Sequence, residues 1–134
     1  MTRVVLDTNI VISALLNPRG SPAQVFLSAI SEPDVLLCVS GDIFAEYEEV
    51  IRRPRFNRSA GEIDAALQTI REEGWWVEPR QRVKACSDPD DDKFLACAQA
   101  ADVHYLVTGN SKHFPAVWFN TRVVTAREFV DAIL

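Results

Sequence analysis

Carboxylate side chains occur in three separated parts of the chain, and carboxylates are groups that hold divalent cations or move protons during hydrolysis. Asp7 directly follows an apolar run, Glu46 lies in an amphipathic segment, and four aspartates occupy the run 88–92. If the fold brings these groups together, they repel one another at neutral pH unless a cation compensates them. Oxygen-only ligands of this kind suit Mg²⁺ or Mn²⁺. The pattern therefore predicts a divalent-metal site built from distant segments.

Two of these signals also have a purely structural interpretation. Asp7 can cap a helix that begins near Ile10. Within the run 88–92, Asp88 can cap a helix that has Pro89 in its first turn, and the following aspartates favour the positive end of the helix dipole. A helix start does not require so many carboxylates. Both interpretations stay open at this point.

Helix periodicity is informative for one further acidic position and ambiguous for another. Asp92 shares a helix side with Leu95 and Ala96, and that side is expected to pack against the sheet. A carboxylate there is costly unless something compensates it, and a bound cation is one such compensation. Glu46 and Glu48 flank the apolar face of their segment about equally, so periodicity does not choose between them.

Short apolar runs alternate with amphipathic segments and predict one α/β domain over residues 1–134. The apolar runs are expected to form buried strands at 3–6, 35–39, 75–77, 104–108 and 122–124. The amphipathic segments are expected to form helices at 10–16, 22–30, 40–53, 60–73, 92–101 and 126–134. Strands that alternate with helices form a parallel sheet covered on both faces.

In such a fold, ligands bind beyond the carboxyl ends of the strands, where the strand order reverses. Polar residues follow two of the expected strands directly. The first strand is followed by Asp7, Thr8 and Asn9, and the fourth runs into Thr108, Gly109 and Asn110. We therefore expect the candidate site at this edge of the sheet.

The composition is that of an ordinary soluble globular domain, with 48% hydrophobic and 25% charged residues. No apolar run approaches the ~18 residues of a membrane span, and Asp7 comes too early for the core of a signal peptide. We therefore expect a cytoplasmic protein with no membrane segment. Zinc is not expected, because the two histidines stand apart and no metal-ligand spacing relates the three cysteines, Cys38, Cys86 and Cys97.

The net charge of −5 argues against a protein that holds nucleic acid by bulk positive charge. It does not exclude a protein that brings a cation to the phosphate. One basic cluster comprises Arg52, Arg53, Arg55 and Arg58. The cluster can contact RNA, or it can be a solvated helix end at which arginines favour the dipole.

Two pairs of aromatic residues have different expected environments. Trp75 and Trp76 lie in an expected strand, so their side chains should point to opposite faces of the sheet and join the core. Trp118 and Phe119 follow Pro115 and are expected in an exposed loop that could contact a partner.

The whole chain resembles the PIN-domain ribonucleases, and in particular the toxin components of bacterial and archaeal toxin–antitoxin pairs. The order and spacing of five segments carry this resemblance, namely 4–9 (VVLDTN), 40–47 (SGDIFAEY), 52–56 (RRPRF), 88–95 (DPDDDKFL) and 105–110 (YLVTGN). The resemblance implies a three-layer α/β/α fold around a five-stranded parallel sheet, with the first and fourth strands as neighbours.

The resemblance also implies roles for individual residues. Asp7, Glu46 and Asp92 match the metal-binding carboxylates of the family, so Glu46 is chosen over Glu48. Thr8 and Thr108 match hydroxyl positions that support the metal site. The remaining supporting candidates are Asn9, Asp90, Asp91 and Asn110.

Asn110 is a departure from the family pattern, because many PIN domains have a fourth acid at this position. An amide can accept a hydrogen bond from a water molecule at the metal, but it adds no negative charge. This difference counts against a second tightly held metal ion. Asp90 or Asp91 could compensate for the missing charge.

The implied activity is an Mg²⁺- or Mn²⁺-dependent endoribonuclease that hydrolyses RNA phosphodiester bonds. A toxin of this kind implies an antitoxin protein that covers the acidic site, and a homodimer is usual in the family. The alternative is a catalytically weak or inactive PIN-fold module that binds RNA or protein, which Asn110 supports. A phosphoryl-accepting receiver domain and an Asp-x-Asp-x-Thr phosphatase fit poorly, because Asp7 is the single acid after the first strand.

Overall fold

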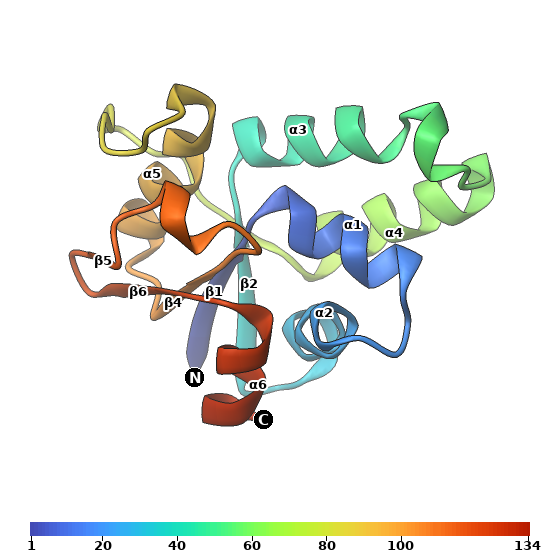
Figure 1. The fold of residues 1–134 in the computed structure, drawn as a ribbon, viewed down its shortest axis with the longest axis horizontal. Coiled ribbons are helices and arrows are strands. Elements are labelled where there is room, and N and C mark those ends of the chain that lie inside the picture. Colours follow the sequence, from blue (N-terminus) through green and yellow to red (C-terminus); the bar gives the residue numbers. More distant parts are fainter.

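The computed structural model describes residues 1–134, which form an α/β domain with helices on both faces of a central sheet. In Figure 1, α5 lies on one side of the strands, and α1 and α2 lie on the other. The helices are α1 (Thr8–Leu16), α2 (Ser21–Ser31), α3 (Gly41–Ile51), α4 (Ala60–Glu73), α5 (Asp92–Ala101) and α6 (Ala126–Ile133). Three short 3₁₀ turns are η1 (Pro54–Phe56), η2 (Pro89–Asp91) and η3 (Ser111–His113).

The sheet has six strands in the order β3-β2-β1-β4-β6-β5. The strands are β1 (Thr2–Leu6), β2 (Val35–Val39), β3 (Trp75–Trp76), β4 (Tyr105–Val107), β5 (Val117–Trp118) and β6 (Thr121–Val124). The five expected strands all pair in parallel, and β1 and β4 are neighbours, as expected. The additional strand β5 pairs antiparallel with β6. The expectation of a five-stranded, purely parallel sheet therefore needs this one correction, because Val117 and Trp118 fall in a segment after Pro115 that is expected to be a loop.

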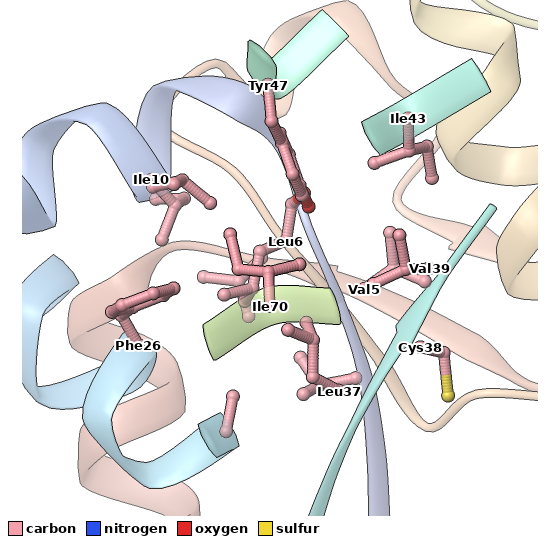
Figure 2. Packing of buried hydrophobic residues seen from close by; sticks show 14 of the residues in the cluster. Val5, Leu6, Ile10, Phe26, Leu37, Cys38, Val39, Ile43, Tyr47 and Ile70 are labelled. Carbon is pink, nitrogen blue, oxygen red and sulfur yellow. The ribbon is translucent and has the colours of Figure 1, made fainter. Parts of the chain in front are cut away.

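The core is one cluster of 34 buried hydrophobic residues centred on β1 and β2. Val4, Val5 and Leu6 are fully buried, as expected for a strand covered on both faces. Figure 2 shows Leu6, Leu37 and other core side chains from the strands meeting those of the surrounding helices. The apolar runs of the sequence thus fix the strands at the centre of the domain.

Local signals set several helix boundaries. Ser40 caps α3 by accepting a hydrogen bond from the N–H of Ile43 at 3.3 Å. Thr125 and Glu128 form a reciprocal capping box at the start of α6. Gly74 ends α4, where a Cβ atom would lie 2.6 Å from the carbonyl oxygen of Ile70. No helix is long and apolar enough to cross a membrane.

The expectation that Trp75 and Trp76 are core residues is wrong. Their exposed fractions are 47% and 41%. The reason is that β3 is an edge strand of two residues, so neither ring is enclosed on all sides. The Trp76 ring packs against Phe44 with centroids 5.2 Å apart, and its indole N–H donates to the carbonyl of Arg71. At the other sheet edge Phe119 is exposed, as expected, whereas Trp118 is half-buried and donates to Gln99.

Candidate active site

Asp7 lies at the carboxyl end of β1, where the strand order reverses between β1 and β4. It occupies the N-cap position of α1, but its side chain makes no capping hydrogen bond. Its Oδ2 atom instead accepts from the hydroxyl of Thr108 at 2.7 Å and from the side-chain amide of Asn9 at 3.3 Å. The capping interpretation of Asp7 therefore does not hold, and its carboxylate is held from the side of β4.

The Asp7 side chain is only 6% exposed, and no cationic side chain forms an ion pair with it. Burial raises the pKa of Asp7 above its ordinary value, and the nearby Glu46 carboxylate raises it further. The hydrogen bonds from Thr108 and from the N–H of Thr8 offset only part of this effect. A buried carboxylate with uncompensated charge is a group that a bound cation would stabilise.

Glu46 reaches the same place from α3. The adjacent Tyr47 is fully buried, and its hydroxyl donates a hydrogen bond to the carbonyl of Leu6, the residue before Asp7. Figure 2 shows the Tyr47 ring extending from α3 towards Leu6. The Oε2 atom of Glu46 accepts from the Thr8 hydroxyl, and Oε1 lies 2.7 Å from Nζ of Lys93. The tyrosine thus fixes α3 over the end of β1 and sets the position of Glu46.

Glu48 lies on the exposed surface rather than at the site. Its Oε2 atom is 3.8 Å from guanidinium nitrogens of both Arg52 and Arg71. The ambiguity between Glu46 and Glu48, which periodicity left open, is therefore resolved by their different surroundings.

Three aspartates of the run 88–92 line the hollow that holds Asp7 and Glu46, and Asp91 is the one whose pKa responds to the charges of both. It is the last residue of η2 and lines the same hollow as these two residues. Burial raises the pKa of Asp91 to about 6, with further contributions from the charges of Asp7 and Asp88. Nδ1 of His113 lies 3.9 Å from the Oδ2 atom of Asp91.

Asp92 is expected beside Asp7 and Glu46, but it lines a neighbouring hollow and is not among the residues that line this one. Its Oδ1 atom accepts hydrogen bonds from the backbone N–H groups of Ala85 at 3.0 Å and Cys86 at 2.8 Å. Burial of Asp92 acts to raise its pKa, but these hydrogen bonds outweigh it and lower the pKa below its ordinary value. Backbone donors therefore compensate part of the Asp92 charge through its Oδ1 atom.

Asp91 and Asp92 lie on the two sides of the junction between η2 and α5. A helical wheel assumes about 3.6 residues per turn, but the 3₁₀ turn has about three. The helical periodicity of α5 predicts the direction of the Asp92 side chain. It does not predict the direction of the Asp91 side chain, because Asp91 precedes the helix. Asp88 does act as a cap, because its Oδ1 atom accepts from the N–H of Asp90 at 3.0 Å.

A hollow of about 530 Å³ unites the carboxyl ends of β1 and β4 with α3 and η2. Its polar lining comes from four separate parts of the chain and includes both histidine and amide groups. The polar residues that line it are Asp7, Thr8, Asn9, Ser13, Glu46, Arg53, Arg55, Asp88, Asp90, Asp91, Asn110 and His113.

The residues after β4 support the site through a short chain of hydrogen bonds. The Thr108 hydroxyl accepts from the N–H of Asn110 at 3.0 Å and donates to Asp7. The N–H of Gly109 donates to the side-chain oxygen of Asn9 at 3.0 Å. The loop after β4 is thereby tied to the loop after β1, and Asn110 is brought to the wall of the hollow.

The arginine cluster is divided by the structure. Arg53 and Arg55 line the hollow, whereas Arg52 and Arg58 do not. Three members are paired with acids on the surface, since Arg52 lies 3.1 Å from Asp64, Arg53 lies 2.8 Å from Glu49, and Arg58 lies 3.5 Å from Glu62. Arg55 lies over the ring of Phe56. Most of the positive charge of this cluster is therefore already compensated.

The donor set suits a hard divalent cation. Asp7, Glu46 and Asp91 offer carboxylate oxygens. Beside burial, the charge of Glu46 raises the pKa of Asp7, and the charges of Asp7 and Glu46 raise the pKa of Asp91. Oxygen-only donors of this kind suit Mg²⁺ or Mn²⁺. The side chains do not close into a group of three or more ligands at metal-binding distance. Instead, the ammonium of Lys93 occupies one oxygen of Glu46.

Three residues at this site were missed by sequence reasoning. Tyr47 was counted only as part of an apolar face, and no pattern signals the partner of its hydroxyl. Lys93 directly follows the aspartate run and could have been noticed as a basic residue beside acidic ones. His113 stands alone in the sequence, and only η3 brings it to Asp91.

Comparison with known proteins agrees with this geometry. The family model described as PIN domain matches residues 3–112. An uncharacterized protein of the archaeon Methanocaldococcus jannaschii is 26% identical over 141 aligned residues, which cover 96% of this chain and 90% of the relative. The matched region contains the candidate metal ligands Asp7, Glu46 and Asp91.

Proposed function

The chain belongs to the PIN domain family, whose members are generally metal-dependent nucleases, and on this premise we propose that it is an Mg²⁺- or Mn²⁺-dependent endoribonuclease. The observation that carries the proposal is the convergence of Asp7, Glu46 and Asp91 on one hollow at the switch between β1 and β4. The position agrees with the general rule for ligand sites in open α/β sheets.

Asp7, Glu46 and Asp91 would hold the cation, with Asp91 taking the role that the sequence alone gave to Asp92. A bound divalent cation neutralises charge on a phosphate and acidifies water. The Thr8 hydroxyl orients Glu46, and the Thr108 hydroxyl orients Asp7. Because Lys93 lies beside Glu46, its ammonium places a further positive charge where a phosphate would enter. This arrangement lets an acidic chain act on a polyanion.

Asn110 adds no negative charge at its position, which counts against a second tightly held cation, whereas Asp88 and Asp90 line the same hollow and could compensate. The proposal has four further parts. The chain would belong to a toxin–antitoxin pair, a partner protein would cover the acidic hollow, the chain would form a homodimer, and it would lie in the cytoplasm. The first three parts rest on the resemblance of the sequence motifs to such toxins, and the location rests on the composition and the lack of a long apolar run.

The second candidate function is an inactive PIN-fold module that binds RNA or protein. The ion pair between Lys93 and Glu46 favours this alternative, since it occupies a carboxylate oxygen that a cation would use. The two candidates differ in whether divalent cations bind and whether RNA is cut.

The test is cleavage of a mixed RNA pool by purified protein with Mg²⁺, with Mn²⁺ and with a chelator. The doubly substituted variant Asp7→Asn/Asp91→Asn removes two proposed ligands. The matched control Asp64→Asn/Asp131→Asn removes the same charge from exposed surface sites. Metal-dependent cutting that only the first variant loses supports the nuclease. Manganese binding without cutting favours the binding module, and cutting that persists in chelator overturns the metal-dependent mechanism.

A further inference from the structure

A second hollow, of about 620 Å³, lies beside the acidic one. One wall is formed by the segment 79–84, which follows β3, and the opposite wall includes Asp90, Asp92 and Lys93. Asp90 also lines the acidic hollow, and Lys93 also contacts Glu46 there. The two hollows are therefore neighbours, joined at Asp90 and Lys93.

The wall 79–84 carries three exposed basic residues, Arg80, Arg82 and Lys84, which we call the basic wall. None of these side chains makes an ion pair or a side-chain hydrogen bond. Val83 lies among them and packs against the core, which keeps its neighbours at the surface. Uncompensated positive charge thus gathers at this place in a chain whose net charge is −5.

The contrast with the arginine cluster at 52–58 is informative. Arg52, Arg53 and Arg58 are each paired with an acid, so a phosphate would have to compete for them. The basic wall has no such competitor within ion-pair distance, although Asp42, Asp90 and Asp92 line the same hollow. The charge of Asp92 is taken up by two backbone N–H groups.

We propose that the basic wall binds the backbone phosphates of a single-stranded RNA and leads the strand past Lys93 into the acidic hollow. The inference rests on the proposed function, since it names how that site receives its substrate. A single strand is the fitting occupant because the basic residues lie within a hollow that continues into the acidic one. Phosphate contacts of this kind position a nucleic acid without reading its sequence.

The test measures binding of a short fluorescent single-stranded RNA by anisotropy, in an Asp7→Asn background so that bound RNA stays intact. The test variant is Arg80→Gln/Arg82→Gln/Lys84→Gln. The matched control, Arg52→Gln/Arg58→Gln/Arg127→Gln, removes the same charge from surface arginines that are each paired with an acid and lie outside the acidic hollow. All six side chains are exposed, and thermal unfolding of each variant checks that the fold is retained.

We expect the test variant to bind RNA about tenfold or more weakly, and the control to change by less than about twofold. The slope of log affinity against log salt should fall by roughly 2 in the test variant only, because each phosphate contact on a single strand contributes about 0.7. Equal weakening of RNA binding in both variants, or unchanged RNA binding in the test variant, contradicts the proposal that the basic wall binds RNA.

A cleavage assay with the chain that keeps Asp7 distinguishes failure of this inference from failure of the proposed function. If that chain cuts RNA with metal and its basic-wall variant binds and cuts equally well, the nuclease stands and the basic wall fails. If the chain never cuts but the basic-wall variant loses RNA binding, the wall stands and the nuclease fails.

Discussion

The ammonium nitrogen of Lys93 lies 2.7 Å from the Oε1 atom of Glu46, and both side chains are 24% exposed. The lysine comes from α5 and the glutamate from α3, so this ion pair joins two elements that flank the acidic hollow. A divalent cation that uses this Glu46 oxygen must displace the lysine. Metal binding at this Glu46 oxygen would therefore change the position of the Lys93 ammonium.

Substitution of Lys93 by Met should strengthen Mn²⁺ binding by roughly twofold to fivefold. Partly exposed ion pairs contribute about 0.2–1 kcal/mol, and this competition is lost with the ammonium. Titration calorimetry measures the change. Lys93→Arg keeps the charge and should bind Mn²⁺ as weakly as the unmodified chain. Equal affinity of Lys93→Met and Lys93→Arg would contradict the competition.

The two neighbouring aspartates should behave differently on substitution. Asp91→Asn should weaken Mn²⁺ binding about tenfold or more, because it removes a proposed ligand. Asp92→Asn should change the affinity by less than about twofold, since the amide oxygen can still accept from Ala85 and Cys86. Titration of both variants with Mn²⁺ measures this difference. A larger loss of Mn²⁺ affinity in Asp92→Asn than in Asp91→Asn would favour Asp92 as the metal ligand.

The stability of the metal-free protein should depend on pH through Asp91. Burial first, and then the charges of Asp7 and Asp88, raises the pKa of this carboxyl to about 6 in the folded state. Between about pH 4 and 6 the folded chain therefore binds more protons at Asp91 than the unfolded chain does. The Asp91 contribution to the free energy of unfolding is then lost as pH rises through this window.

Urea denaturation in chelator, from pH 4.5 to 7, tests this dependence. The difference in midpoint between Asp91→Asn and the unmodified chain should grow in favour of the variant as pH rises, and then level off above about pH 6. Parallel profiles for the two proteins would rule out a raised pKa for Asp91.

The hydroxyl of Tyr47 should contribute both to stability and to metal binding. Tyr47→Phe removes the donor to the Leu6 carbonyl in a fully buried position, which should cost about 1–2 kcal/mol. Glu46 is next in sequence, so Mn²⁺ affinity should also fall. Tyr105→Phe is the matched control, because the Tyr105 ring packs on Phe129 and its hydroxyl has no partner within the chain. Denaturation and calorimetry would contradict this role if both variants behaved alike.

A carboxylate at position 110 should tighten divalent binding. Asn110→Asp adds negative charge to the wall of the hollow, and we expect Mn²⁺ affinity to rise by several-fold. In chelator the same variant should be less stable, because a further like charge joins Asp7 and Asp91. Asn120→Asp, next to Asp102 at a remote site, is the control for charge alone. Equal metal affinity in both variants would place residue 110 outside the metal site.

The local patterns of the sequence determined the strands, the helices and the position of Asp7. A continuous apolar run as short as 35–39 is typical of a strand covered on both faces, and β2 forms there. Asp7 was identifiable because it ends such a run, and parallel strands expose their carboxyl ends at one edge. The choice of Glu46 over Glu48 came from the family resemblance rather than from periodicity.

Only the tertiary structure showed that Asp91 lines the hollow with Asp7 while Asp92 lines the neighbouring one, which acid Lys93 contacts, and which basic residues have no acidic partner. Asp91 and Asp92 differ by one position at a junction of 3₁₀ and α geometry, where neither period describes the side-chain directions. The pairing of Lys93 with Glu46 spans 47 residues of sequence. The charges of Arg52 and Arg80 look alike in a sequence, but one meets Asp64 across a packed helix pair and the other meets no acid. Such differences depend on contacts between distant segments, which local pattern does not encode.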